Sequence, residues 1–149
     1  MSLQNVEIAN CALTKGDSPV TVSDGVEKLQ LFRFGFKNNT HSKNAATISF
    51  SNHDGSLNLT EVQFHGNNGT KDFVAQLSRK TFLQDVEVAG NNARLVVLQF
   101  PTQADVSIVN LTANNNTGTV MQIQENSTAF VSDSTFTDNE NRESEMQGA

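Results

Sequence analysis

The chain has no tryptophan, no tyrosine, a single cysteine and two prolines among its 149 residues. One cysteine cannot form an internal disulfide, so packing and hydrogen bonds must hold the fold together. No apolar run approaches the roughly 18 residues of a membrane-spanning helix, and no charged segment followed by an apolar one opens the chain. We therefore expect neither a membrane span nor a signal peptide within this sequence.

Basic residues are also scarce. The chain has 10 Lys and Arg residues against 16 Asp and Glu residues, which gives a formal net charge of −6. The basic residues are scattered and form no stripe that could neutralise phosphates, so we expect neither nucleic acid nor an anionic membrane as a partner. The apolar content of 36% is low for a globular protein but is usual for a single repetitive domain with a narrow core.

A repeated spacing organises the chain: apolar residues at positions 1, 3, 6 and 8 are followed by Asn at position 11. The copies lie about 23 to 28 residues apart, and self-similarity at such a period is typical of solenoids. The five copies are Leu29, Leu31, Phe34, Phe36, Asn39; Leu57, Leu59, Val62, Phe64, Asn67; Thr81, Leu83, Val86, Val88, Asn91; Ala104, Val106, Val109, Leu111, Asn114; and Ala129, Val131, Ser134, Phe136, Asn139. An earlier copy with Leu3, Val6 and Ile8 has Cys11 in the Asn position.

Alternation of apolar and polar residues with period two is typical of strands, and the two-residue step between positions 3 and 6 predicts a bend. A repeat of this length is too short for a strand, a crossover helix and a return strand. We therefore predict an all-β parallel β-helix (β-solenoid) of about six coils over residues 1–139. Residues 140–149 lack apolar alternation and are predicted to be a polar C-terminal cap or a frayed tail.

The recurring Asn predicts an inward ladder of stacked amides, because equivalent side chains of successive coils lie on one another. The predicted ladder consists of Asn39, Asn67, Asn91, Asn114 and Asn139. Cys11 would then be a small buried residue of the first coil rather than a nucleophile.

Three segments, FKNN from Phe36, FHGN from Phe64 and FTDN from Phe136, carry a family resemblance. They resemble the Phe-x-x-Asn repeats of right-handed parallel β-helices of the pectin-lyase-like class, notably the passengers of polymorphic outer-membrane proteins and related adhesins. The resemblance covers most of the chain. It implies a right-handed helix, a role in surface adhesion or scaffolding, and no cofactor.

Pectin-degrading members of that fold class place acids on outward positions of adjacent coils, which makes Glu61, Asp85 and Glu87 the candidate catalytic residues here. Coil spacing would set such carboxylates about 5 Å apart, the separation found in retaining glycosidases. However, solvated carboxylates are common on β surfaces, and the paired-Asp, Gly-His-Gly and Arg-Ile-Lys motifs of polygalacturonases are absent. A carbohydrate-active enzyme, either a polysaccharide lyase or a glycoside hydrolase, is therefore the second interpretation.

Asn-X-Ser/Thr sequons favour a secreted or cell-surface glycoprotein. The candidate glycosylation sites are Asn38, Asn58, Asn68, Asn110, Asn115 and Asn126.

The preferred interpretation is a non-enzymatic, extracellular structural or adhesive module, either a segment of a longer repeat protein or one that assembles through its ends. No spacing of His, Cys or acidic residues predicts a metal site, and we expect no cofactor. The expected partners are a second copy or neighbouring solenoid segments, together with a glycan or cell-surface ligand. The first coil keeps Leu3, Val6 and Ile8, so its open edge is expected to be the adhesive end.

Overall fold

The computed structural model describes residues 1–13, 18, 20–22, 26–41, 46–50, 55–69 and 73–140. Within these ranges every regular element is a β-strand, and every strand pair is parallel. The chain is therefore an all-β parallel solenoid, as the repeat spacing predicted. No helix in the described ranges is long and apolar enough to cross a membrane.

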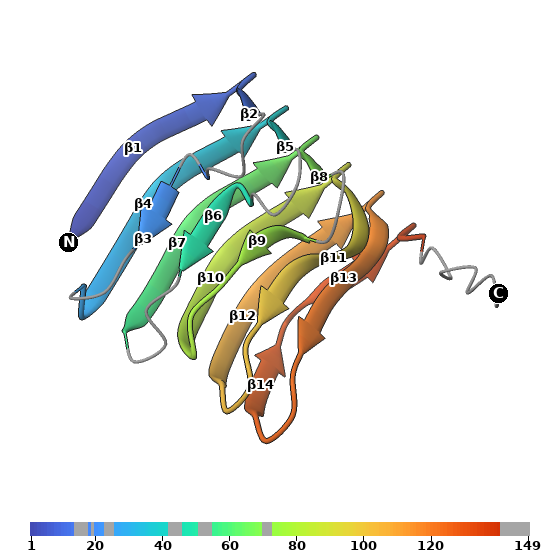
Figure 1. Cartoon of the computed structure of the whole chain (residues 1–149). Coiled ribbons are helices and arrows are strands. Elements are labelled where there is room, and N and C mark those ends of the chain that lie inside the picture. Colours follow the sequence, from blue (N-terminus) through green and yellow to red (C-terminus); the bar gives the residue numbers. More distant parts are fainter. Residues whose placement is uncertain are drawn as a thin grey trace, which may run out of the picture.

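The first sheet contains the longest strands, one from each copy of the repeat. In spatial order these are β1 (Ser2–Ala9), β4 (Lys28–Lys37), β7 (Ser56–His65), β10 (Lys80–Ala89), β12 (Asp105–Asn114) and β14 (Thr128–Ser132), with β15 (Thr135–Thr137) also pairing β12. Figure 1 shows these strands side by side along the axis, from the blue N-terminal end to the orange C-terminal end. Spatial order follows sequence order because each coil adds one strand beside the previous one.

The second sheet returns the chain to the start of the next coil. It contains β2 (Ala12–Leu13), β5 (Thr40–His41), β8 (Asn68–Gly69), β11 (Asn92–Phe100), β9 (Phe73–Gln76), β6 (Ile48–Phe50) and β3 (Val20–Val22), with β13 (Thr117–Ile123) pairing β11. In the early coils two short strands contribute to this sheet, whereas β11 spans both places in the coil that contains β10. The later copies have a shorter repeat, and each has one long strand, β11 or β13, in this sheet.

The core lies between the two sheets and is built from stacked columns of equivalent residues. In β7 the inward side chains Leu57, Leu59, Val62 and Phe64 are fully buried, and the residues between them are not. Phe36 and Phe64, one coil apart, stack with ring centroids 5.0 Å apart and an interplanar angle of 9°. Burial of each large ring against the next coil supplies much of the hydrophobic stabilisation.

Each long strand bends at one residue in the left-handed backbone region. These residues are Asn5, Arg33, Glu61, Asp85, Asn110 and Asp133, with φ between 51° and 56°. A second left-handed residue precedes the ladder position in each coil: Asn10, Asn38, Gly66, Gly90, Asn115 and Asp138. Asn, Asp and Gly tolerate this region best, so the two columns explain why these residue types recur at the corners.

The fourth copy of the repeat begins two residues later than the sequence analysis placed it. Val106 pairs with Thr81, and Ile108 pairs with Leu83. The inward residues are therefore Val106, Ile108, Leu111 and Ala113, all buried, and the ladder position falls on Asn116. The assignment of Asn114 to the ladder was wrong: its side chain is partly exposed and bonds no described residue, although its carbonyl accepts the Gly90 N–H at 3.0 Å.

The solenoid has about four complete turns rather than the six expected. Strands β4, β7, β10 and β12 are paired on both sides, whereas β1 and β14 are edge strands of the first sheet. The first and last copies therefore contribute only partly covered coils. Glu140 forms an isolated parallel bridge with Thr117, and residues 141–149 of the expected tail lie outside the described part of the chain.

Candidate functional site

The Asn ladder runs along one edge of the core and joins consecutive coils. In each step the Oδ1 of one Asn accepts two hydrogen bonds, from the backbone N–H and from the Nδ2 of the Asn one coil earlier. The ladder runs through Asn39, Asn67, Asn91, Asn116 and Asn139, with all eight donor–acceptor distances between 2.9 and 3.1 Å. Each amide is thus tied to its neighbour through both its donors and its acceptor.

A further bond fixes each ladder amide to the strand of the preceding coil. Asn67 Nδ2 donates to the Phe36 carbonyl at 2.9 Å, and Asn91 Nδ2 donates to the Phe64 carbonyl at 2.7 Å. Asn39, Asn67, Asn91 and Asn116 are no more than 1% exposed. Because these buried polar groups are fully paired, the ladder stabilises the stack and does not destabilise the core.

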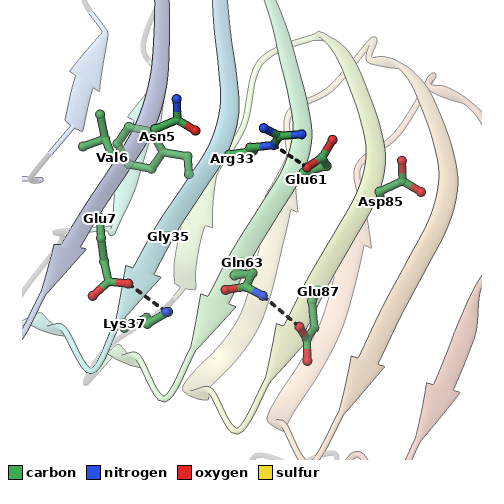
Figure 2. A pocket seen from close by; sticks show the side chains of 11 residues that line it. Asn5, Val6, Glu7, Arg33, Gly35, Lys37, Glu61, Gln63, Asp85 and Glu87 are labelled. Atoms are coloured by element: carbon green, nitrogen blue, oxygen red, sulfur yellow. Dashed lines mark hydrogen bonds and ion pairs between the residues drawn. The ribbon is translucent and has the colours of Figure 1, made fainter.

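A groove of about 420 Å³ lies on the outer face of the first sheet, along the bend of the strands. Figure 2 shows the side chains of four successive strands converging on it. Its charged and polar lining consists of Asn5, Glu7, Arg33, Lys37, Glu61, Gln63, Asp85 and Glu87. The groove therefore contains the three candidate catalytic carboxylates, and it also contains two cations that the sequence analysis did not assign to a site.

The two cations are both engaged with carboxylates from an adjacent coil. Arg33 Nε lies 2.8 Å from Glu61 Oε2, and Lys37 Nζ lies 2.7 Å from Glu7 Oε2. The second pair crosses above Gly35, where an added Cβ would meet Glu7 Cγ at 3.4 Å and Lys37 Cε at 3.5 Å. These are ordinary contact distances, so the Glu7 and Lys37 side chains pack directly over the Gly35 backbone.

The other two candidate carboxylates also contact neighbouring coils. Asp85 Oδ1 accepts a hydrogen bond from Asn110 Nδ2 at 2.7 Å. Glu87 Oε2 accepts one from Gln63 Nε2 at 3.3 Å, and His65 Nε2 lies 3.2 Å from the same oxygen without the alignment of a hydrogen bond. The structure thus gathers Glu61, Asp85 and Glu87 in one groove and gives each a partner within the fold.

The groove is open to solvent. The Glu61 and Glu87 side chains are 43% and 40% exposed. Charge stabilisation in an active site is strongest where water is excluded, so this surface does not provide that advantage. Among the described residues, no three His, Cys, Asp or Glu side chains are grouped so that they could hold a metal ion.

Arg33 and Glu61 break the pattern of the bend, because the other four residues in that column are Asn or Asp. Long side chains in the left-handed region cost about 1 kcal/mol or more. Their ion pair offsets part of this cost, although both side chains are substantially exposed and an exposed pair contributes little.

The sequons lie mostly at corners of the coil. Asn38, Asn110, Asn115 and Asn126 are exposed and have φ between 50° and 57°. Asn58 and Asn68 are half-buried strand residues. The left-handed corners favour Asn by themselves, so the fold accounts for four of the sequons without glycosylation.

The two ends of the stack expose side chains that belong to the inward columns. Val6 is 37% exposed in the first coil, and Val131 and Phe136 are 42% and 45% exposed in the last. Their equivalents in the inner coils, such as Leu59 and Phe64, are fully buried. Met1, beside Leu29 in the same column, is 71% exposed, so both ends of the stack expose core side chains.

The strand order and the stacked columns define the chain as a parallel β-solenoid protein. No protein-family model matches the chain, and neither a curated protein nor a solved structure is significantly similar to it.

Proposed function

We propose that the chain is a non-enzymatic, extracellular structural or adhesive module that joins neighbouring solenoid segments through its ends. The exposure of the end columns carries this proposal. Val131 and Phe136 sit in columns that are fully buried one coil earlier, at Ile108 and Ala113. Another coil stacked on this surface would continue the strand pairing and remove the two side chains from water.

The resemblance of the Phe-x-x-Asn repeats to adhesin passengers of the pectin-lyase-like class supports the same proposal. In a stack of this kind, stability comes from contacts between neighbouring coils, so length and stiffness can be extended by adding coils. The groove on the first sheet gives such a module a polar surface for a glycan or cell-surface ligand.

The alternative is a glycan-cleaving enzyme that uses the groove, and its support is the convergence of Glu61, Asp85 and Glu87 there. A retaining glycosidase needs one carboxyl group as acid and one as nucleophile, both directed at the scissile bond. Here the carboxylates instead accept bonds from Arg33, Asn110 and Gln63 of adjacent coils. These contacts favour the structural function.

Purified protein is expected to show no turnover of polygalacturonate or of neutral glycans. Reducing-end release and the absorbance of unsaturated products are the measurements, and they cover hydrolysis and lyase chemistry. The double variant Glu61→Gln with Glu87→Gln removes two of the candidate acids, and Glu125→Gln is the matched control at an exposed position away from the groove. Turnover by the wild type that is lost in the double variant and kept in the control would make the enzyme the better interpretation.

A further inference from the structure

The Asn ladder has a direction. Every ladder Oδ1 accepts from the coil before it, and from Asn39 to Asn116 the backbone N–H and one Nδ2 hydrogen donate to the Asn of the coil after it. A ladder of this kind therefore has two chemically different ends, one that presents an acceptor position and one that presents donors. The residues at these ends decide which coil fits beside each of them.

At the N-terminal end the acceptor is missing. Cys11 occupies the ladder position, and its backbone N–H donates to Asn39 Oδ1 at 3.1 Å. Its thiol lies 3.5 Å from the Ala9 carbonyl, and sulfur is a weak acceptor. A coil placed before the first one would find no amide oxygen for its own Asn donors.

At the C-terminal end the donors are present and without an acceptor in the described chain. Asn139 Oδ1 accepts from Asn116, and Asn139 Nδ2 donates to the Ala113 carbonyl at 3.0 Å. In the inner coils the backbone N–H and the second amide hydrogen bond the next Asn Oδ1. No described residue provides that oxygen for Asn139, and the exposed Val131 and Phe136 belong to the same coil.

We infer that the C-terminal face of the last coil docks a parallel β-coil that carries Asn at the ladder position, supplied by another solenoid segment. This inference rests on the proposed function and specifies the partner. The incoming amide oxygen would accept both Asn139 donors, and its apolar residues would cover Val131 and Phe136. The adhesive end is thus the last coil, whereas the sequence analysis placed it at the first.

A second wild-type copy does not meet this requirement. Stacked head to tail, it presents Cys11 to Asn139 and leaves the donors unpaired. Stacked with the two C-terminal faces together, it opposes donors with donors. An unpaired buried donor is costly, so the ladder selects against both arrangements.

The test supplies the missing acceptor on a second copy through Cys11→Asn. The variant is expected to associate head to tail, with Leu3 and Ile8 of one molecule over Val131 and Phe136 of the next. Two added hydrogen bonds should lower the dimer dissociation constant roughly tenfold or more relative to the wild type. Light scattering and sedimentation velocity over a concentration series measure this shift.

Three further variants make the outcome decisive. Cys11→Leu has the branched shape of Asn without an acceptor and should behave as the wild type. Cys11→Asp restores an acceptor oxygen and should also promote association, which guards against a folding defect specific to Cys11→Asn. Adding Asn139→Ala to Cys11→Asn removes the Nδ2 donor and keeps the backbone N–H, so it should reduce the gain, and urea unfolding checks that each variant is folded.

If the wild type and Cys11→Leu associate as tightly as Cys11→Asn, the requirement for an amide acceptor at the ladder position is wrong. Association through the ends of the solenoid would still hold. Monomeric behaviour of both Cys11→Asn and Cys11→Asp at all concentrations would overturn the docking inference. Neither result depends on the glycan assay, whose outcome bears on the proposed function alone.

Discussion

Phe64→Ala is expected to lower the free energy of unfolding by about 4 kcal/mol, as large-to-small substitutions of buried Phe do. Phe64 is fully buried in the middle of the stack, and its ring lies 5.0 Å from that of Phe36. Truncation removes the apolar area and leaves a cavity between two coils that backbone pairing holds at a fixed spacing. Because the coils cannot close over the gap, relaxation should recover little of this cost. Urea unfolding followed by circular dichroism measures it.

Phe130→Ala is the matched control, because that ring points outward and is 61% exposed. Its removal is expected to change the free energy of unfolding by no more than about 0.5 kcal/mol. Equal losses in the two variants would contradict the inward stacking of Phe64 and with it the assignment of columns in the first sheet.

Asn91→Ala is expected to lower the free energy of unfolding by about 3 kcal/mol, since removing one partner leaves buried groups unsatisfied. The Asn91 Oδ1 accepts two bonds from Asn67, and its Nδ2 donates to Asn116 Oδ1 and to the Phe64 carbonyl. Substitution leaves the Asn67 N–H and Nδ2 donors without an acceptor in a site from which water is excluded. The effect should therefore exceed that of a typical single hydrogen bond.

Asn92→Ala is the control for Asn91→Ala. The neighbouring Asn92 is half-buried at the start of β11, and its side chain bonds no described residue. The same chemical change there should cost less than about 1 kcal/mol. If the two variants unfolded at the same urea concentration with the same slope, the ladder would not be the source of stability that its geometry indicates.

Most of the fold could be predicted from the sequence, because one spacing is repeated with little variation. In β7 the apolar residues at positions 1, 3, 6 and 8 correspond directly to four buried columns. The left-handed backbone at the corners favours particular polar residue types, whatever contacts they make. These types therefore also recur in the sequence.

The error in the fourth copy has a specific physical origin. Three consecutive Asn residues, Asn114 to Asn116, and six apolar residues in two alternating groups of three allow two registers that fit the apolar template equally well. The left-handed corners distinguish them. The assumed register would put Ile108 in the left-handed bend, where a β-branched residue is strongly disfavoured, whereas the observed register puts Asn110 there. The presence of Asn or Asp at position 5 was thus the signal that could have resolved the register.

The partners in the groove were harder to predict. Arg33 and Glu61 share one outward column, so their ion pair could have been expected from the repeat alone. The pair of Lys37 with Glu7 could not, because it runs diagonally across strands over Gly35 rather than along one column. A cluster read from the sequence as acidic is therefore a set of paired groups in the structure.

The direction of the ladder was also beyond the sequence pattern. Recurrence shows that an Asn is present in each coil, but it does not show which coil provides the donor and which the acceptor. The orientation of each amide follows from the backbone at the corner, where the N–H of the ladder residue points toward the next coil. This orientation makes the two ends unequal, and it is the basis for the docking inference at Asn139.

An Asn ladder in the observed register joins the coils, and one pair of unfolding measurements tests this directly. Asn116→Ala and Asn114→Ala are the same substitution two residues apart in one Asn-rich turn. The structure predicts that Asn116→Ala lowers the free energy of unfolding by about 2 to 3 kcal/mol, and that Asn114→Ala changes it by about 0.5 kcal/mol or less. A larger loss in Asn114→Ala, or equal losses in both variants, would contradict the register and the ladder built on it.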